Sequence, residues 1–115
     1  HRQERCDYPD FAAVACAKIH TGEATWGLLL CGTGVGMSMS ANRCTGIRAA
    51  VVSDSFSAAA TRQHNNANVL CLGSRVVGMG LALQIIDAWC GASFEGGRHQ
   101  ARIDKMMNLN EKERS

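Results

Sequence analysis

The sequence lacks the features that would direct it into a membrane or out of the cell. It has no run of about 18 apolar residues and no signal peptide. Its six cysteines include no C-x-x-C pair, and several lie in apolar segments, where a cysteine acts as a small buried hydrophobe. We therefore expect a cytoplasmic protein with reduced thiols and no membrane partner.

Several familiar binding and catalytic motifs are absent as well. The net charge of +2 is too small to predict nucleic-acid binding. The four histidines lack the spacing of metal ligands and no H-x-x-x-H occurs, so we predict no metal site. The chain has no G-x-S-x-G elbow, and its glycine cluster is neither a G-x-G-x-x-G fingerprint nor a P-loop.

What is present suits one globular α/β domain. The chain has 115 residues, of which 46% are hydrophobic and 19% charged, and we treat residues 1–115 as a single domain with a frayed tail at 111–115. Apolar runs alternate with helix-like segments, which is typical of a parallel sheet covered on both faces. The nearly unbroken apolar run at 26–31 predicts a strand buried on both faces. The expected strands are 26–31, 47–52 and 69–72, and the expected helices are 9–20, 36–43, 56–65, 78–89 and 98–109.

The sheet is small for this class, and the sequence begins at His1 without an initiator methionine. We therefore expect an N-terminally truncated chain.

The first candidate site lies at the end of the 26–31 strand. Cys31 is followed by the glycine-rich turn 32–36, and ligands of open parallel sheets bind beyond the carboxyl ends of strands. Glycine turns let backbone N–H groups converge on an anion, although the same residues suit a plain strand-to-helix turn. A helix N-terminus stabilises a thiolate, so Cys31 is a candidate nucleophile or general base. We interpret the other five cysteines as structural.

A second set of candidates is polar or basic. His64 and Asn65 end a helix, where a histidine can move protons or simply complement the helix dipole. Arg98 and Arg102 lie one turn apart near a helix start, a poor place for cations unless an anion is close. This pair indicates phosphate binding, with a solvated charged face as the alternative. His99 lies about 100° around the helix from Arg98 and need not join the pair.

Six segments, taken in order, resemble ribose-5-phosphate isomerase type B, whose wider family includes allose-6-phosphate and galactose-6-phosphate isomerases. The resemblance covers about Asp7 to Asn110 and depends on the order of the motifs. It implies a Rossmann-like three-layer sandwich that works without metal or cofactor, as a homodimer or tetramer with active sites at the subunit interface. The segments are LLCGTGVGMS at 29–38, ANR at 41–43, GIRA at 46–49, RQHNNANVL at 62–70, GSRVVG at 73–78 and FEGGRH at 94–99.

The resemblance also implies roles for single residues. Cys31 would be the general base that moves a proton between C2 and C1 through an enediolate, with loop amides stabilising the oxyanion. His64, with Thr33, would open the furanose ring. The implied substrate-binding residues are Gly32, Gly34, Gly36, Met37, Ser38 and Asn65, together with Arg75, Arg98 and Arg102 at the phosphate, with the neighbouring subunit as one source of the last two.

The implied reaction interconverts ribose 5-phosphate and ribulose 5-phosphate, a step of the pentose phosphate pathway. Family members begin with a strand that ends in an Asp-His pair, and this sequence has no counterpart, so we expect the first strand and helix to be missing. Two alternatives stay open. One is an isomerase of a six-carbon sugar phosphate such as allose 6-phosphate, and the other is a non-catalytic sugar-phosphate-binding or subunit-assembly module.

Overall fold

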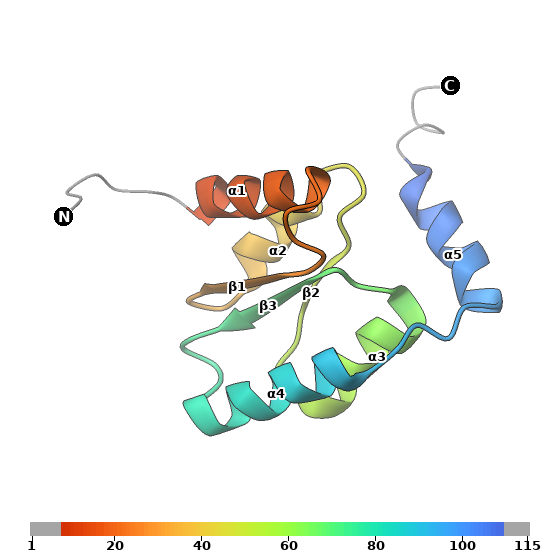
Figure 1. Cartoon of the computed structure of the whole chain (residues 1–115). Coiled ribbons are helices and arrows are strands. Elements are labelled where there is room, and N and C mark those ends of the chain that lie inside the picture. Colours follow the sequence, from red (N-terminus) through yellow and green to blue (C-terminus); the bar gives the residue numbers. More distant parts are fainter. Residues whose placement is uncertain (1–7, 110–115) are drawn as a thin grey trace.

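The structure is a computed structural model that describes residues 8–109, in which a small parallel sheet lies between helices (Figure 1). The central strand β3 pairs with β1 on one side and with β2 on the other. The tail expected at 111–115 and the cap expected from Asp7 lie outside the described residues. The elements are α1 Tyr8–His20, β1 Gly27–Cys31, α2 Val35–Ala41, β2 Ala49–Val51, α3 Ser55–Asn65, β3 Val69–Gly73, α4 Met79–Gly91 and α5 Arg98–Met107.

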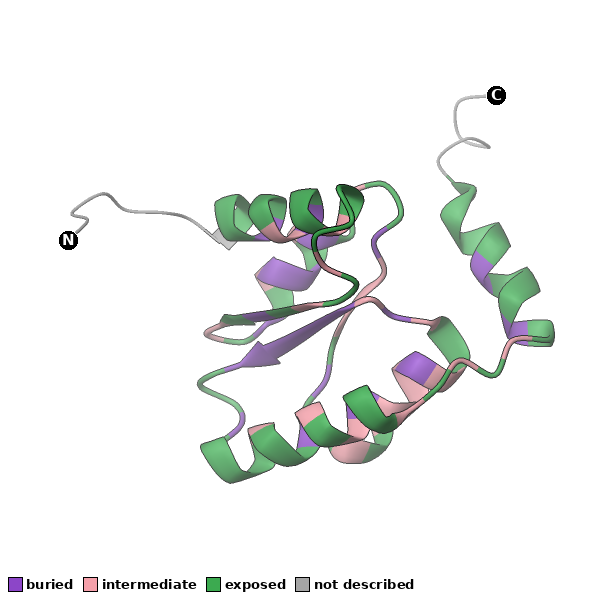
Figure 2. Cartoon of the chain, in the orientation of Figure 1, coloured by how far each residue is buried: buried purple, intermediate pink, exposed green. Residues whose placement is uncertain are grey.

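Two apolar layers cover the two faces of the sheet, which confirms the expected three-layer sandwich. All five residues of β3 are buried, and successive side chains point to opposite faces. Val69 and Cys71 pack with buried residues of α1 and α2, whereas Leu70 and Leu72 pack with those of α3 and α4. Figure 2 shows β3 as a continuous buried element between the layers.

The prediction that the 26–31 strand is buried on both faces is wrong. Leu29 is 8% exposed, but Leu28 and Leu30 are 48% and 55% exposed. The reason is the strand order, because β1 lies at an edge of the sheet and the helices of the second layer pack on β3 instead. In the part of the chain described, one face of β1 therefore stays open.

Side-chain contacts fix both ends of α3. Its N-cap Asp54 accepts a hydrogen bond of 2.7 Å from the backbone N–H of Ser57, which lowers the pKa of the Asp54 carboxyl. At the other end the buried Arg62 donates to the carbonyl of Ala67 at 2.6 Å. The Arg62 guanidinium also lies 4.7 Å from the ring centre of Trp26 and 5.4 Å from that of Trp89. These contacts hold the end of α3 against the start of β3.

The last helix, α5, projects beyond the three layers (Figure 1). His99 and Ile103 are its buried residues, and the ring of His99 stacks on that of His64 at the end of α3. Its remaining apolar side chains, Met106 and Met107, are exposed. Within residues 8–109, no helix is long and apolar enough to span a bilayer.

Candidate active site

Cys31 is the last residue of β1, and the glycine-rich turn folds back over its thiol. The backbone N–H of Gly34 donates to Cys31 Sγ at 3.2 Å. Gly34 has φ +82°, and a Cβ there would lie 2.7 Å from a methyl of Val51. Only glycine fits this conformation and this space without a shift, so the sequence of the turn sets the position of the thiol.

The end of β3 packs directly against the same turn. A Cβ on Gly73 would lie 2.6 Å from the backbone carbonyl of Thr33. The two backbones therefore approach so closely that only a residue without a side chain fits at position 73. Ser74 N–H donates to the carbonyl of Cys31 at 2.8 Å, and Arg75 N–H donates to that of Gly32 at 2.9 Å. The side chain of Arg75 consequently lies beside Gly32, at the carboxyl edge of the sheet.

Not every predicted loop residue can offer its side chain to a ligand. Met37 is 5% exposed and belongs to the core beneath α2. Ser38 is also buried, and its hydroxyl donates to the carbonyl of Val35 at 2.7 Å. Thr33, by contrast, is exposed, and its Oγ1 accepts from Val35 N–H at 3.3 Å. We call Cys31, residues 32–38 and Arg75 the Cys31 cluster.

The second set of predicted residues forms another group, which we call the His64 cluster and which comprises His64, Asn65, Arg98 and Arg102. His64 and Asn65 are the last two residues of α3, and α5 begins at Arg98. The ring of His99 stacks on that of His64, with centroids 4.6 Å apart, which places the start of α5 beside the end of α3. All four members of the cluster are at the surface, and none is buried.

The two clusters lie at opposite ends of the strands, one at the carboxyl end of the sheet and the other near its amino end. The register pairs Cys31 with Gly73 at the carboxyl edge and Gly27 with Val69 at the amino edge. Because α3 runs back from the end of β2 to the start of β3, His64 lies near the amino edge, about 13 Å of strand away from Cys31. Figure 1 shows the arrowheads of β1 and β3 pointing away from α5. Within one chain, the structure therefore does not bring His64 next to Thr33.

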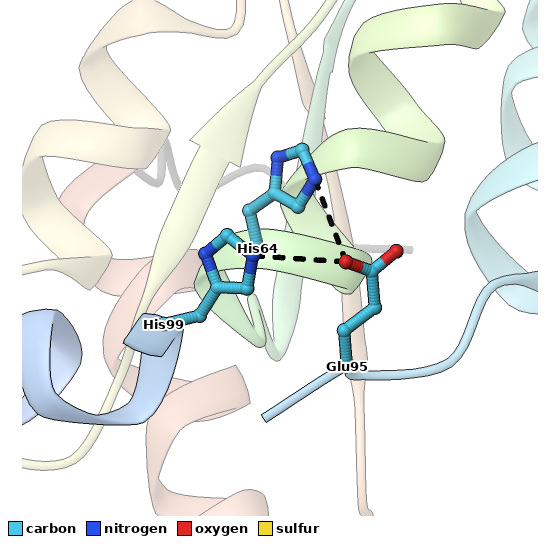
Figure 3. A group of neighbouring side chains, drawn as sticks. All are labelled: His64, Glu95 and His99. Atoms are coloured by element: carbon cyan, nitrogen blue, oxygen red, sulfur yellow. Dashed lines mark ion pairs between the residues drawn. The ribbon is translucent and has the colours of Figure 1, made fainter. Parts of the chain in front are cut away.

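The sequence analysis missed two residues that contact His64 or lie close to it. His99 is 9% exposed and joins His64 and Glu95 in one group (Figure 3). Glu95 Oε1 lies 3.9 Å from His64 Nε2 and 3.6 Å from His99 Nε2. No local pattern in the sequence predicted this group, because Glu95 precedes α5 and lies beside the end of α3 through the hydrogen bond of its N–H to the carbonyl of Gln63.

These three side chains also bear on metal binding. Their ligand atoms all lie within 4.8 Å of one another, and a pair of imidazoles with a carboxylate is a common donor set for zinc or iron. However, the two rings are stacked with an interplanar angle of 18°. An imidazole lone pair lies in the plane of its ring, and two nearly parallel stacked planes do not meet at one ion. We therefore assign no metal to this group.

The cysteine thiols differ in how far they are buried. Desolvation raises the pKa of the Cys71 thiol to about 12, and the neighbouring Cys31 contributes further. Cys16 likewise has its pKa raised to about 12, first by burial and then by Cys44. Both thiols are at most 2% exposed, so they belong to the core. Cys31 is instead half-buried and accepts a hydrogen bond at a strand end.

The parallel sheet between two helical layers defines a Rossmann-like α/β domain, with Cys31 at the carboxyl end of a strand, where such domains bind ligands. The sequence model of the family described as Ribose/Galactose Isomerase matches residues 1–106. The chain belongs to this family.

Individual relatives extend over most of the chain. Ribose-5-phosphate isomerase B of Escherichia coli is 50% identical over 109 residues, which are 95% of this chain and 73% of that protein. The solved structure of the Clostridium thermocellum ribose-5-phosphate isomerase B is similar with a TM-score of 0.92 and 47% identity, over 98% of this chain and 76% of that one. The Mycoplasma genitalium enzyme, solved with bound ribulose-5-phosphate, gives a TM-score of 0.88 at 45% identity, over 97% and 74% of the two chains.

Proposed function

We propose that this protein interconverts an aldose phosphate and a ketose phosphate, with ribose 5-phosphate and ribulose 5-phosphate as the pair. The observation that carries the proposal is the Cys31 thiol, which ends a parallel strand and receives the N–H of Gly34 inside a glycine-rich turn. Family membership supplies the class of reaction. The enzyme would act in the cytoplasm, and the interconversion would be a step of the pentose phosphate pathway.

The Cys31 cluster has the parts that proton transfer requires. A thiolate at Cys31 would remove the proton from C2 of the open-chain aldose and return it to C1, and the intermediate is an enediolate. Backbone N–H groups of residues 32–38 would stabilise the negative oxygen that forms, an effect commonly worth about 3 kcal/mol for one well-placed donor. The buried side chain of Met37 leaves its backbone N–H for this role, whereas the N–H of Ser38 already donates to the carbonyl of Gly34 at 3.1 Å.

The His64 cluster would bind the phosphate and open the sugar ring. Arg98 and Arg102 offer two exposed guanidinium groups one helical turn apart, and His64 and Asn65 lie next to the start of that helix. His64 would move the proton that opens the furanose ring, and Asn65 would bind substrate hydroxyls. Arg75 belongs to the other cluster, where it would reach the phosphate from beside Gly32.

A second copy of the chain would bring the two clusters together. Because they lie at opposite edges of one sheet, a complete site needs the Cys31 cluster of one subunit and the His64 cluster of its partner. The projecting helix α5, with exposed Met106 and Met107, supports such an exchange. We infer a homodimer, or a tetramer built from such dimers, with each site at the subunit interface.

The experiment compares Cys31→Ala with the wild-type protein in an assay that follows ribulose 5-phosphate formed from ribose 5-phosphate. The exposed thiol of α4 gives a matched control, Cys90→Ala. We expect turnover to fall about a thousandfold or more in Cys31→Ala and to be unchanged in Cys90→Ala. Near-normal turnover by Cys31→Ala would contradict the mechanism. Stabilisation by the sugar phosphate without any wild-type turnover would favour a binding module instead.

A further inference from the structure

The groups around His64 differ on its two sides. One face of its imidazole is covered by the ring of His99, and its Nε2 edge is directed toward the carboxylate of Glu95 (Figure 3). The side chain of His64 is nevertheless 46% exposed, and its Nδ1 edge points away from Glu95 (Figure 3). A flexible exposed histidine would not need this arrangement.

We propose that Glu95 and His99 are positioning residues for His64, and that they fix its ring plane and its tautomer for ring opening. This inference rests on the proposed function, because it assigns these residues to the ring-opening step of that reaction. Neither residue has to touch the substrate. Both would act through the orientation and protonation of the His64 imidazole.

Glu95 is held in place by the backbone rather than by its own side chain. Its N–H donates to the carbonyl of Gln63 at 3.0 Å, and Gln63 precedes His64 in the chain. The segment before α5 is thereby fastened to the last turn of α3. This bond holds the Glu95 backbone within one side-chain length of His64, while the Glu95 side chain itself is 53% exposed.

His99 supplies the rigid part of the arrangement. Its side chain is 11% exposed, against 53% for Glu95, so it cannot swing away as an exposed ring could. Burial is the first cause that lowers the pKa of His99, and the neighbouring His64, Arg98 and Arg102 lower it further, while Glu95 opposes them. His99 therefore stacks on His64 as a neutral ring near pH 7, without adding a positive charge to it.

The chemical consequence concerns which nitrogen of His64 carries the proton. The distances from Glu95 Oε1 to the two Nε2 atoms, 3.6 and 3.9 Å, are those of ion pairs and are too long for hydrogen bonds. A carboxylate at this range still favours the tautomer with the proton on Nε2, which leaves the Nδ1 lone pair free. Catalytic contacts of this kind commonly tighten when substrate binds.

A free Nδ1 is what ring opening requires. When a furanose opens, the anomeric hydroxyl loses its proton, the bond between C1 and the ring oxygen breaks, and the ring oxygen gains a proton. The Nδ1 of His64 can accept the first proton and deliver it to the ring oxygen, so the imidazole is unchanged at the end. With the proton on Nδ1 instead, the same edge could not act as the base.

The decisive measurement reads the tautomer without any turnover. Protein labelled with ¹⁵N in its histidines would be compared by long-range ¹H–¹⁵N spectra at pH 8 for the wild type, Glu95→Leu, Glu95→Asp and His99→Phe. We expect His64 to carry its proton on Nε2 in the wild type and to become a mixture of tautomers in Glu95→Leu. Glu95→Asp should retain the wild-type tautomer in part, because it keeps the carboxylate.

The kinetic measurement shows whether this tautomer matters to the reaction. We expect Glu95→Leu to lower kcat for ribose 5-phosphate about tenfold or more with little change in KM. His99→Phe, which keeps an aromatic ring on His64, should lose less than His99→Ala. The matched control is Glu23→Leu, which removes another exposed carboxylate, one that pairs with Lys18 at 3.2 Å. It should leave both the tautomer and the rate unchanged.

The possible outcomes separate this inference from the proposed function. An unchanged His64 tautomer in Glu95→Leu would overturn the inference, whatever the activity. A changed tautomer with a wild-type rate would overturn it too, since the positioning would then have no effect on the reaction. If the wild type isomerises no sugar phosphate, the proposed function fails, while the spectra still decide whether Glu95 sets the tautomer. Melting temperatures of all variants would show that each is folded.

Discussion

At the scale of single residues, the thiols differ because of their surroundings. Cys16 and Cys71 are enclosed in the core with pKa values raised to about 12, so thiolate formation is suppressed at neutral pH. Cys31 is half-buried at a strand end, and Cys90 is exposed on α4. The thiols of Cys16 and Cys71 thus pack in the core, whereas those of Cys31 and Cys90 are accessible to reagents.

This contrast predicts a labelling pattern. In native protein treated with iodoacetamide at pH 7.5, we expect modification at Cys90 and Cys31 and none at Cys16 or Cys71 within the time in which Cys90 reacts fully. Peptide mass spectrometry reads each site separately. After unfolding in guanidinium all four should react alike, which serves as the control. Early native modification of Cys71 would contradict the assigned core.

The buried His99 predicts a pH dependence of stability. Its pKa is lowered in the folded protein from an ordinary value of 6.5, first by burial and then by His64 and Arg98. Between the two pKa values the unfolded chain binds a proton that the folded chain does not, so stability is full above pH 6.5 and declines as the pH falls through this window. Urea midpoints at about pH 7.5, 6.0 and 5.0 should decline less in His99→Gln than in the wild type. Equal declines would show that His99 does not contribute.

At the scale of elements, the turn after β1 and the end of β3 form one packed unit. A Cβ on Gly73 would lie 2.6 Å from the Thr33 backbone, and backbone atoms cannot move aside as a flexible side chain can. We expect Gly73→Ala to destabilise the protein by about 2–4 kcal/mol and to lower activity, because the turn that holds Cys31 must shift.

Gly80 provides the matched control for this prediction. It lies in α4, and a Cβ added there would meet no atom within 4 Å outside the neighbouring backbone of its own helix, so Gly80→Ala adds the same group in open space. That change should be neutral or stabilise the helix by up to about 1 kcal/mol. Chemical denaturation of the two variants gives the comparison. Equal effects would show that the close approach at Gly73 is not tight.

Local sequence predicted these elements well because their signals are local. Cys31, the glycine turn and the alternation of strands and helices are all read from short segments. The open face of β1 was not predictable in this way, since Leu28 and Leu30 look the same in a central and in an edge strand. His99 was set aside because its angle around α5 separates it from Arg98, and only the packing of α5 on α3 reveals its stack on His64.

At the scale of the whole molecule, the topology decides where the candidate residues can meet. A helix that follows a parallel strand returns to the amino edge of the sheet, and this alone places His64 away from Cys31. The resemblance predicted active sites at a subunit interface, with the neighbouring subunit as one source of Arg98 and Arg102, but the motif order contains no information about which end of the sheet each motif reaches. Within one chain, the fold places these residues in two clusters at opposite ends of the strands.

The division into two clusters predicts that inactive variants restore each other. In a heterodimer of Cys31→Ala with His64→Gln, one site receives Cys31 from one chain and His64 from the other, while the second site lacks both. Co-expression with two different affinity tags would isolate this heterodimer, and we expect about half of the wild-type activity per dimer, although each homodimer is inactive. The control heterodimer combines Cys31→Ala with Arg75→Gln, two changes in the same cluster. Each of its sites carries one defect, so its activity should stay low. If sites were complete within single chains, the first heterodimer would be as inactive as its parents, and the shared site would be disproved.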